Sequence, residues 1–183
     1  GTVELHLGNF ERSEALLKDV LKTSEKFAGD DYGIYSKGFA QYGLGELEYE
    51  RGNIKAAQGW YQKALATWQD PVRKDPVRHI SYALNGLGFV ALKEKRYEEA
   101  HCFFSDGVRS AEEFGRVDEL AKGQLGLASV YLENGTDLKT ALILVNESIE
   151  GFQQQGMQYQ IQKGLTLRDD ILKAESEIPT QPR

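Results

Sequence analysis

The sequence contains one cysteine and four prolines among 183 residues, and its acidic side chains outnumber its basic ones by 28 to 22. Because Cys102 has no second cysteine to pair with, we expect no internal disulfide and a reducing, cytoplasmic environment. No apolar run approaches the ~18 residues that cross a bilayer, so we expect no membrane span. The formal charge of −6 disfavours nucleic acid as a partner, since phosphate binding needs a basic surface. The scarcity of proline leaves room for long helices.

The sequence does contain an internal repeat. A small residue recurs at steps of 44, 43 and 41 residues, at Ser13, Ala57, Ala100 and Ala141. A leucine followed by a small residue precedes the last three of these positions, in the pairs Leu44-Gly45, Leu87-Gly88 and Leu127-Ala128. Apolar side chains around each small residue recur every three or four positions, which indicates amphipathic helices. Four evenly spaced matches predict stacked helix pairs.

These motifs resemble the tetratricopeptide repeat (TPR), whose helix-turn-helix unit carries a Leu-Gly pair and then Ala-x3-aromatic. The resemblance covers residues 3–155, with Gln41, Leu84 and Gln124 where the family has tryptophan. The period of 41–44 residues is longer than the usual ~34 and is similar to the TPR units of kinesin light chains, cell-polarity adaptors and NTPase-coupled regulators. It implies an all-α fold, a right-handed α-solenoid of antiparallel helix pairs with about eight helices.

The periodicity and the turn signals divide the chain into helices and repeats. The predicted helices span 10–27, 32–51, 54–69, 76–94, 97–114, 117–134, 138–154 and 157–176. We expect one domain over 1–176, followed by a disordered tail over 177–183. It comprises a partial repeat 1–31, full repeats 32–75, 76–116 and 117–156, and a capping helix 157–176. Because the first repeat lacks most of its first helix, we expect the sequence to be an excerpt of a longer protein.

The turns carry residues that favour helix ends. Gly8, Gly52 and Gly135 suit the left-handed conformation that follows a helix, because glycine has no side chain to clash. The remaining turn offers Glu94-Lys95-Arg96, so we expect Lys95 or a neighbour to take this conformation with some strain. Pro71 is expected to end a helix, and Asp75 with Pro76 reads as an N-cap followed by the first helical position.

Candidates for catalysis or metal binding are weak. His6, His79 and His101 fall in different repeats without metal-ligand spacing, and His101 and Cys102 point apart as neighbours on a helix. No glycine-rich segment is followed by the Lys-Ser/Thr of a phosphate-binding loop. We therefore expect no enzyme activity, catalytic residue, cofactor or metal. The basic cluster Arg73, Lys74, Arg78 and His79 is the one local feature that would suit an acidic partner or a phosphate group.

In TPR arrays the first helices of successive repeats line a concave groove that receives a peptide or a partner helix. By position, the resemblance implies that this groove contains Phe39, Tyr42, Glu46 and Tyr49, then Tyr82, Asn85, Phe89 and Leu92, then Lys122, Leu125, Ser129 and Leu132. Glu50, Lys93 and Glu133 would flank them. Aromatic rings beside Glu46 and Glu50 suit an apolar segment that bears Lys or Arg, whereas packing between first helices is the other interpretation of these rings.

Three functions remain open on this evidence. The leading hypothesis is a non-enzymatic protein–protein interaction module. The first alternative is a sensor arm of a larger signalling NTPase or transcription regulator that binds a small molecule or peptide. The second is a self-assembling scaffold that forms homo-oligomers through exposed stack ends. The basic carboxylate clamp of chaperone-binding TPR domains is disfavoured, because only Asn85 and Lys122 could contribute to it.

Overall fold

The computed structural model describes residues 9–27, 31–69 and 78–177. Within these ranges the chain is entirely helical, with no strand, which confirms the predicted all-α class. The helices are α2 (Phe10–Ser24), the 3₁₀ helix η1 (Glu25–Phe27), α3 (Asp31–Glu50), α4 (Ile54–Trp68), α5 (Ile80–Lys93), α6 (Tyr97–Glu113), α7 (Val117–Glu133), α8 (Leu138–Gln154) and α9 (Gln158–Glu177). Pro71, Arg73, Lys74, Asp75, Pro76 and the predicted tail from 178 lie outside the described residues.

Two helix boundaries differ from the prediction by more than one residue. The α-helical part of α2 ends at Ser24, after which η1 continues as a tighter 3₁₀ turn. Helix α5 begins at Ile80 and not at residue 76, since Arg78 and His79 form a turn. The His79 backbone is non-helical (φ −123°, ψ 4°), and its ring packs edge-on against Tyr35 and Phe39, with both centroid distances 5.0 Å. Packing against α3 therefore sets the start of α5.

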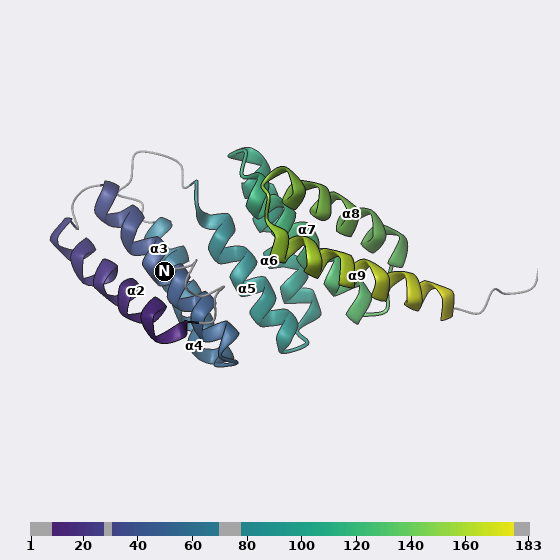
Figure 1. The fold of residues 1–183 in the computed structure, drawn as a ribbon, viewed down its shortest axis with the longest axis horizontal. Helices are drawn as coiled ribbons and strands as arrows, with labels where there is room; N and C mark the ends of the chain where they lie inside the picture. Colours follow the sequence, from purple (N-terminus) through teal and green to yellow (C-terminus); the bar gives the residue numbers. More distant parts are fainter. Residues whose placement is uncertain (1–8, 28–30, 70–77, 178–183) are drawn as a thin grey trace, which may run out of the picture.

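The helices follow one another along the longest axis of the molecule, from α2 at one end to α8 and α9 at the other (Figure 1). Each helix packs against the next in sequence, and the first helices also contact one another in the order α3, α5, α7 and α9. This pattern of contacts between near neighbours is that of a helical solenoid.

An aromatic ring links adjacent helix pairs. Tyr61 of α4 is 1% exposed and lies between Gly45 of α3 and Gly86 of α5. A Cβ atom at either glycine would lie 2.6 Å from this ring, closer than side chains approach one another. Phe104 of α6 makes the same kind of contact with glycines of α5 and α7. The glycines beside the repeated leucines are therefore required by packing and not by a phosphate-binding loop.

The turn at Lys95 confirms the prediction made for it. Lys95 has φ 59° and is the one non-glycine residue of the described chain with a positive φ. Gly52 and Gly135 occupy the equivalent turns with φ 80° and 65°. Lys95 thus stands where the equivalent turns of the other repeats have glycine. Its Cβ makes the left-handed backbone conformation sterically unfavourable.

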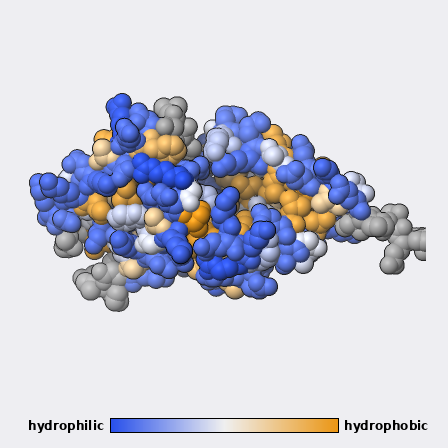
Figure 2. Space-filling view, turned by 90° about the horizontal axis from the view of Figure 1, so that it is seen from below, coloured by the Kyte–Doolittle hydropathy of each residue, from blue (hydrophilic) through white to orange (hydrophobic). Residues whose placement is uncertain are grey.

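The surface is mixed in character. Figure 2 shows a face of the molecule on which hydrophobic side chains gather in a hollow, over the half that contains α5 to α9, while hydrophilic side chains form most of the rim. In the described part of the chain, no helix has the length and apolarity needed to cross a membrane.

Candidate functional site

A cavity of about 330 Å³ lies between the first helices α3, α5, α7 and α9. Seven residues that the sequence assigned to the groove line it: Tyr42, Glu46, Tyr49, Tyr82, Phe89, Lys122 and Leu125. The other lining residues are Glu50, Tyr61, Asp118, Glu119, Phe152, Met157, Tyr159, Gln160 and Lys163. The fold thus gathers most of the predicted positions around one partly open cavity.

The remaining predicted residues lie elsewhere. Phe39 packs edge-on against Trp68 and Tyr82 in a neighbouring aromatic cluster, with both centroid distances 5.2 Å. Asn85 and Leu92 are buried among the helices, at 0% and 7% exposure. Ser129, Leu132, Lys93 and Glu133 do not line the cavity either. Packing between helices therefore uses Phe39, Asn85 and Leu92, whereas Lys93 and Glu133 are exposed and the Ser129 hydroxyl donates to the Leu125 carbonyl of its own helix.

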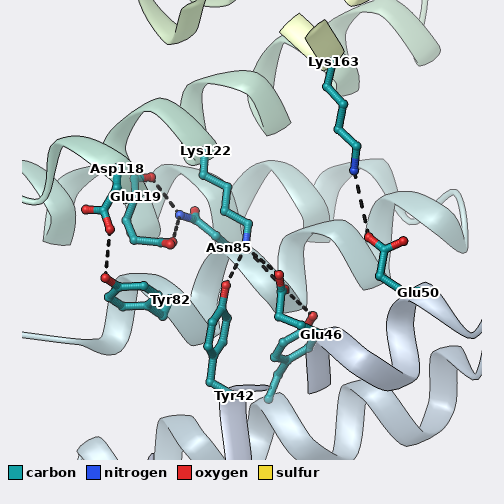
Figure 3. A network of polar contacts seen from close by, with 10 residues as sticks. Tyr42, Glu46, Glu50, Tyr82, Asn85, Asp118, Glu119, Lys122 and Lys163 are labelled. Carbon is teal, nitrogen blue, oxygen red and sulfur yellow. Dashed lines mark hydrogen bonds and ion pairs between the residues drawn. The ribbon is translucent and has the colours of Figure 1, made fainter. Parts of the chain in front are cut away.

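Lys122 of α7 reaches across the cavity to α3, as Figure 3 shows. Its Nζ donates a hydrogen bond of 2.6 Å to the Tyr42 hydroxyl and lies 3.3 Å from both carboxylate oxygens of Glu46. The same ammonium lies 5.1 Å from the centre of the Tyr42 ring, and the Tyr61 hydroxyl donates to Glu46 over 2.6 Å. The aromatic and acidic setting that the sequence predicted for a partner's cation is thus already occupied by a lysine of this chain.

The charges of this cluster stabilise one another. Burial pushes the pKa of Glu46 upward, but the charge of Lys122 and the hydrogen bond from Tyr61 outweigh it, so the pKa lies below its ordinary value. Burial acts to lower the pKa of Lys122, and the carboxylates of Glu46 and Glu119 overcome this effect and raise it. Both partners therefore stay ionised around neutral pH.

A second cluster holds the start of α7 against α5. The Tyr82 hydroxyl donates to Asp118 Oδ2 over 2.9 Å, and the Arg116 guanidinium pairs with the same oxygen at 3.3 Å. Arg116 also donates to the Tyr82 hydroxyl and lies over its ring, 5.1 Å from the centroid. Burial raises the pKa of Asp118, but the hydrogen bond from Tyr82 and the charge of Arg116 leave it below the usual value.

Glu119 is a cavity residue that the sequence did not reveal. It is 4% exposed, and its Oε2 accepts a 2.8 Å hydrogen bond from Asn85 Nδ2, which also donates to the Glu119 backbone carbonyl (Figure 3). Burial, more than any charge, raises its pKa from 4.5 to about 7. In the sequence, Glu119 and Lys122 are spaced like an exposed helical ion pair, so only the folded structure shows that Glu119 is buried.

The predicted capping helix also forms a wall of the cavity. The cavity is lined here by Met157, which directly precedes α9, and by Tyr159, Gln160 and Lys163 of α9. Lys163 Nζ lies 4.0 Å from Glu50 of α3 and 4.5 Å from the centre of the Tyr159 ring. Lys163 therefore links α9 to α3 across the hollow.

Among residues 9–27, 31–69 and 78–177, no three His, Cys, Asp or Glu side chains are grouped so as to hold a metal ion. His101 lies outside the cavity, with its Nε2 3.3 Å from the Tyr131 hydroxyl. The cavity itself combines aromatic walls with carboxylates, which suits an apolar ligand of positive charge.

The fold and the cavity place the chain in the class of helical repeat proteins. It matches no protein-family model, and the search of curated proteins finds no match. Among solved structures it is similar to the crystal structure of BtubC (BKLC) from P. vanneervenii, with a TM-score of 0.62 over 95% of this chain and 76% of that chain. At 16% sequence identity this similarity shows a shared helical fold alone.

Proposed function

We propose that this chain is a non-enzymatic interaction module of TPR type that binds an apolar peptide or helical segment bearing a basic side chain. The observation that carries the proposal is the lining of the cavity. Five tyrosines, two phenylalanines, a leucine and a methionine form its walls, and four carboxylates face two lysines. Apolar walls favour burial of a side chain of the partner. Because Arg116 pairs with Asp118, the four carboxylates exceed their basic partners by one, Glu119, which favours a cation.

The contacts of the cavity refine which residues would meet a partner. Tyr42 is 6% exposed and its hydroxyl is bound to Lys122, so it supports the cavity more than it presents a surface. Tyr49 and Phe89 are half-buried, and their rings lie 6.5 Å apart on α3 and α5. These two rings are the best probes of binding, because they can be shortened with less damage to the core.

The expected result is a loss of affinity in the double variant Tyr49→Ala/Phe89→Ala. Peptides selected against the chain from a random library should carry apolar residues and a Lys or Arg, and they should bind the variant at least about tenfold more weakly, since two aromatic contacts are removed. Fluorescence anisotropy with labelled peptides measures this. Ile143→Ala is the matched control, because Ile143 is 59% exposed on α8 and does not line the cavity.

Thermal unfolding followed by circular dichroism separates lost binding from lost folding. If the double variant remains helical and binds the selected peptides as tightly as the control, the cavity is not the binding site and the proposal is wrong.

The cavity volume favours one other candidate function. At about 330 Å³ the space is near the lower end of ligand pockets, and it would suit a small molecule or a single side chain better than a long helix. A sensor arm that binds a small apolar molecule is therefore the second candidate. The sensor function would be favoured if free small amines bound more tightly than any selected peptide and if Tyr49→Ala/Phe89→Ala lost this binding.

A further inference from the structure

The carboxylates of the cavity are not equally neutralised. Three of the four have a basic partner: Glu46 pairs with Lys122 at 3.3 Å, Asp118 with Arg116 at 3.3 Å, and Glu50 with Lys163 at 4.0 Å. Glu119 is the exception, since it forms no ion pair with any residue that the structure describes. Its Oε2 accepts one hydrogen bond from Asn85, which is neutral.

Glu119 is also the most buried of these acids. It is 4% exposed, and the lining of the cavity is mainly aromatic and apolar. An ionised carboxylate in such surroundings is unfavourable unless a cation neutralises it. Lys122 attracts it through space, but the ammonium of Lys122 is bonded to Tyr42 and Glu46. Since no basic group of the described residues forms an ion pair with Glu119, a ligand could supply the counter-charge.

We propose that Glu119 receives the ammonium group of the cavity's ligand, an apolar primary amine that is either a lysine side chain of a partner or a free molecule. This proposal rests on the proposed function, because it needs the cavity to be the binding site. The aromatic walls would contact the apolar part of the ligand, and the hydrogen bond from Asn85 would hold the carboxylate in place.

The surroundings of Glu119 make the proposed contact dependent on pH. The groups whose charges act on it are Lys122, Asp118 and Arg116 of the α7 region, Glu46 and Tyr42 of α3, and Tyr82 of α5. Burial raises the pKa of Glu119 to about 7. The pKa values of the other two acids, Glu46 and Asp118, are lowered. The pKa values of the tyrosines and of the basic groups are raised, at Tyr42, Tyr82, Lys122 and Arg116. Of these groups, Glu119 alone titrates near neutral pH.

The sign of the effect follows from the direction of this shift. Glu119 has a pKa of about 7 in the folded protein, against the ordinary value of 4.5, so the folded, empty protein holds the proton more strongly. The resulting contribution to the free energy of unfolding is fully present below about pH 4.5 and is lost as the pH rises through about 7. An ammonium ligand binds the ionised form, so its binding displaces the proton. Apparent affinity is proportional to the ionised fraction, and it should be about tenfold weaker at about pH 6 than at the plateau above about pH 8.

Isothermal titration calorimetry of the chain tests this with two charged probes. Phenylbutylamine represents a free amine, and an end-blocked peptide with lysine between phenylalanine and leucine represents a partner segment. Phenylbutanol and the same peptide with norleucine in place of lysine are the uncharged controls. We expect at least one charged probe to bind more tightly than its control above about pH 7, and to lose about tenfold in affinity by about pH 6. Which of the two binds identifies the source of the amine.

The variant Glu119→Gln keeps the shape of the neutral acid and its acceptor for Asn85, but it cannot ionise. It should bind the charged probe at least about tenfold more weakly at about pH 8 and show no dependence on pH between about 6 and 8. The control is Glu150→Gln, at an exposed residue of α8 that does not line the cavity. It should change neither the affinity for the charged probe nor the dependence of that affinity on pH. If Glu119→Gln is not folded, proton release by the unmodified chain, measured in buffers of different ionisation enthalpy, replaces it.

The possible failures are distinguishable from those of the proposed function. If the norleucine peptide binds as tightly as the lysine peptide, and Tyr49→Ala/Phe89→Ala abolishes both, the cavity is a binding site but Glu119 does not receive a cation. Equal pH profiles for Glu119→Gln and the unmodified chain would overturn the proposal in the same way. Absence of binding by both charged probes at every pH would also overturn it, while the library-selected peptides decide the proposed function independently.

Discussion

At the scale of single residues, the stack depends on close contacts between rings and glycines. The Tyr61 ring is buried between α3 and α5, and the Phe104 ring is buried in the same way between α5 and α7. Since well-packed interiors leave no room for an added methyl group at such points, the small residues of the Gly-Leu-Gly segments are as important as the large ones. These contacts hold α3 and α5 side by side as neighbouring walls of the cavity.

The variant Gly86→Ala should therefore lower the free energy of unfolding by about 1–3 kcal/mol, because its Cβ would lie 2.6 Å from the Tyr61 ring. Gly59→Ala is the matched control in the middle of α4, where an added Cβ meets nothing within 4 Å. That control should raise the free energy of unfolding by up to about 1 kcal/mol, since alanine favours helices more than glycine does. Urea titration followed by circular dichroism measures both; equal effects of the two substitutions would contradict the packing argument.

At the scale of helices and turns, the hairpins end in a common way. At five turns of the described chain the backbone N–H of the left-handed residue donates to a carbonyl of the preceding helix: Gly52 to Tyr49, Lys95 to Leu92, Gly115 to Glu112, Gly135 to Leu132 and Gly156 to Gln153. The position requires the left-handed conformation whatever residue occupies it, because the next helix must reverse direction. The steric cost at Lys95 is therefore imposed by the hairpin and is offset by the packing of α5 against α6.

The variant Lys95→Gly should raise the free energy of unfolding by roughly 0.5–1 kcal/mol. The gain is limited because glycine also makes the unfolded chain more flexible. Gly135→Ala, at φ 65° with nothing within 4 Å of an added Cβ, should have the opposite sign and a similar size. Thermal unfolding of both variants gives the comparison, and a loss of stability in Lys95→Gly would show that the lysine side chain contributes more than its conformation costs.

At the scale of the whole molecule, side chains join helices that are distant in the stack. Units of a solenoid usually contact only their neighbours, and the helix packing follows this rule. The Lys122 contacts with Tyr42 and Glu46 and the Lys163 contact with Glu50 cross the hollow and connect α7 and α9 to α3. These contacts join helices that do not pack directly against one another.

Removing the charge in Lys122→Met should lower the free energy of unfolding by about 1–3 kcal/mol, because it leaves the carboxylate of Glu46 partly buried without its counter-charge. The double variant Glu46→Gln/Lys122→Met should recover part of this loss, since no unpaired charge remains. Urea titrations of the single and double variants measure the coupling. A double variant that is less stable than Lys122→Met alone would show that the ion pair is not what Lys122 contributes.

Of the sixteen residues that line the cavity, the resemblance to TPR arrays had indicated seven. The helices and their turns could be predicted from the sequence. These depend on local rules: the three-to-four periodicity of apolar residues, the small residues at even steps, and the glycines after helices. The strain at Lys95 was predictable for the same reason, because it stands where equivalent turns have glycine.

The tertiary structure alone decided which side chains meet across the hollow. The Lys122 ammonium and the Tyr42 hydroxyl belong to residues 80 positions apart, and their contact depends on the accumulated rotation of successive helix pairs, which no local pattern encodes. The same accumulation brings α9 to the cavity and leaves Glu119 buried without an ion-pair partner among the described residues. Small angles between neighbouring helices add along the stack, so the chemistry of the cavity emerges only when the whole solenoid is assembled.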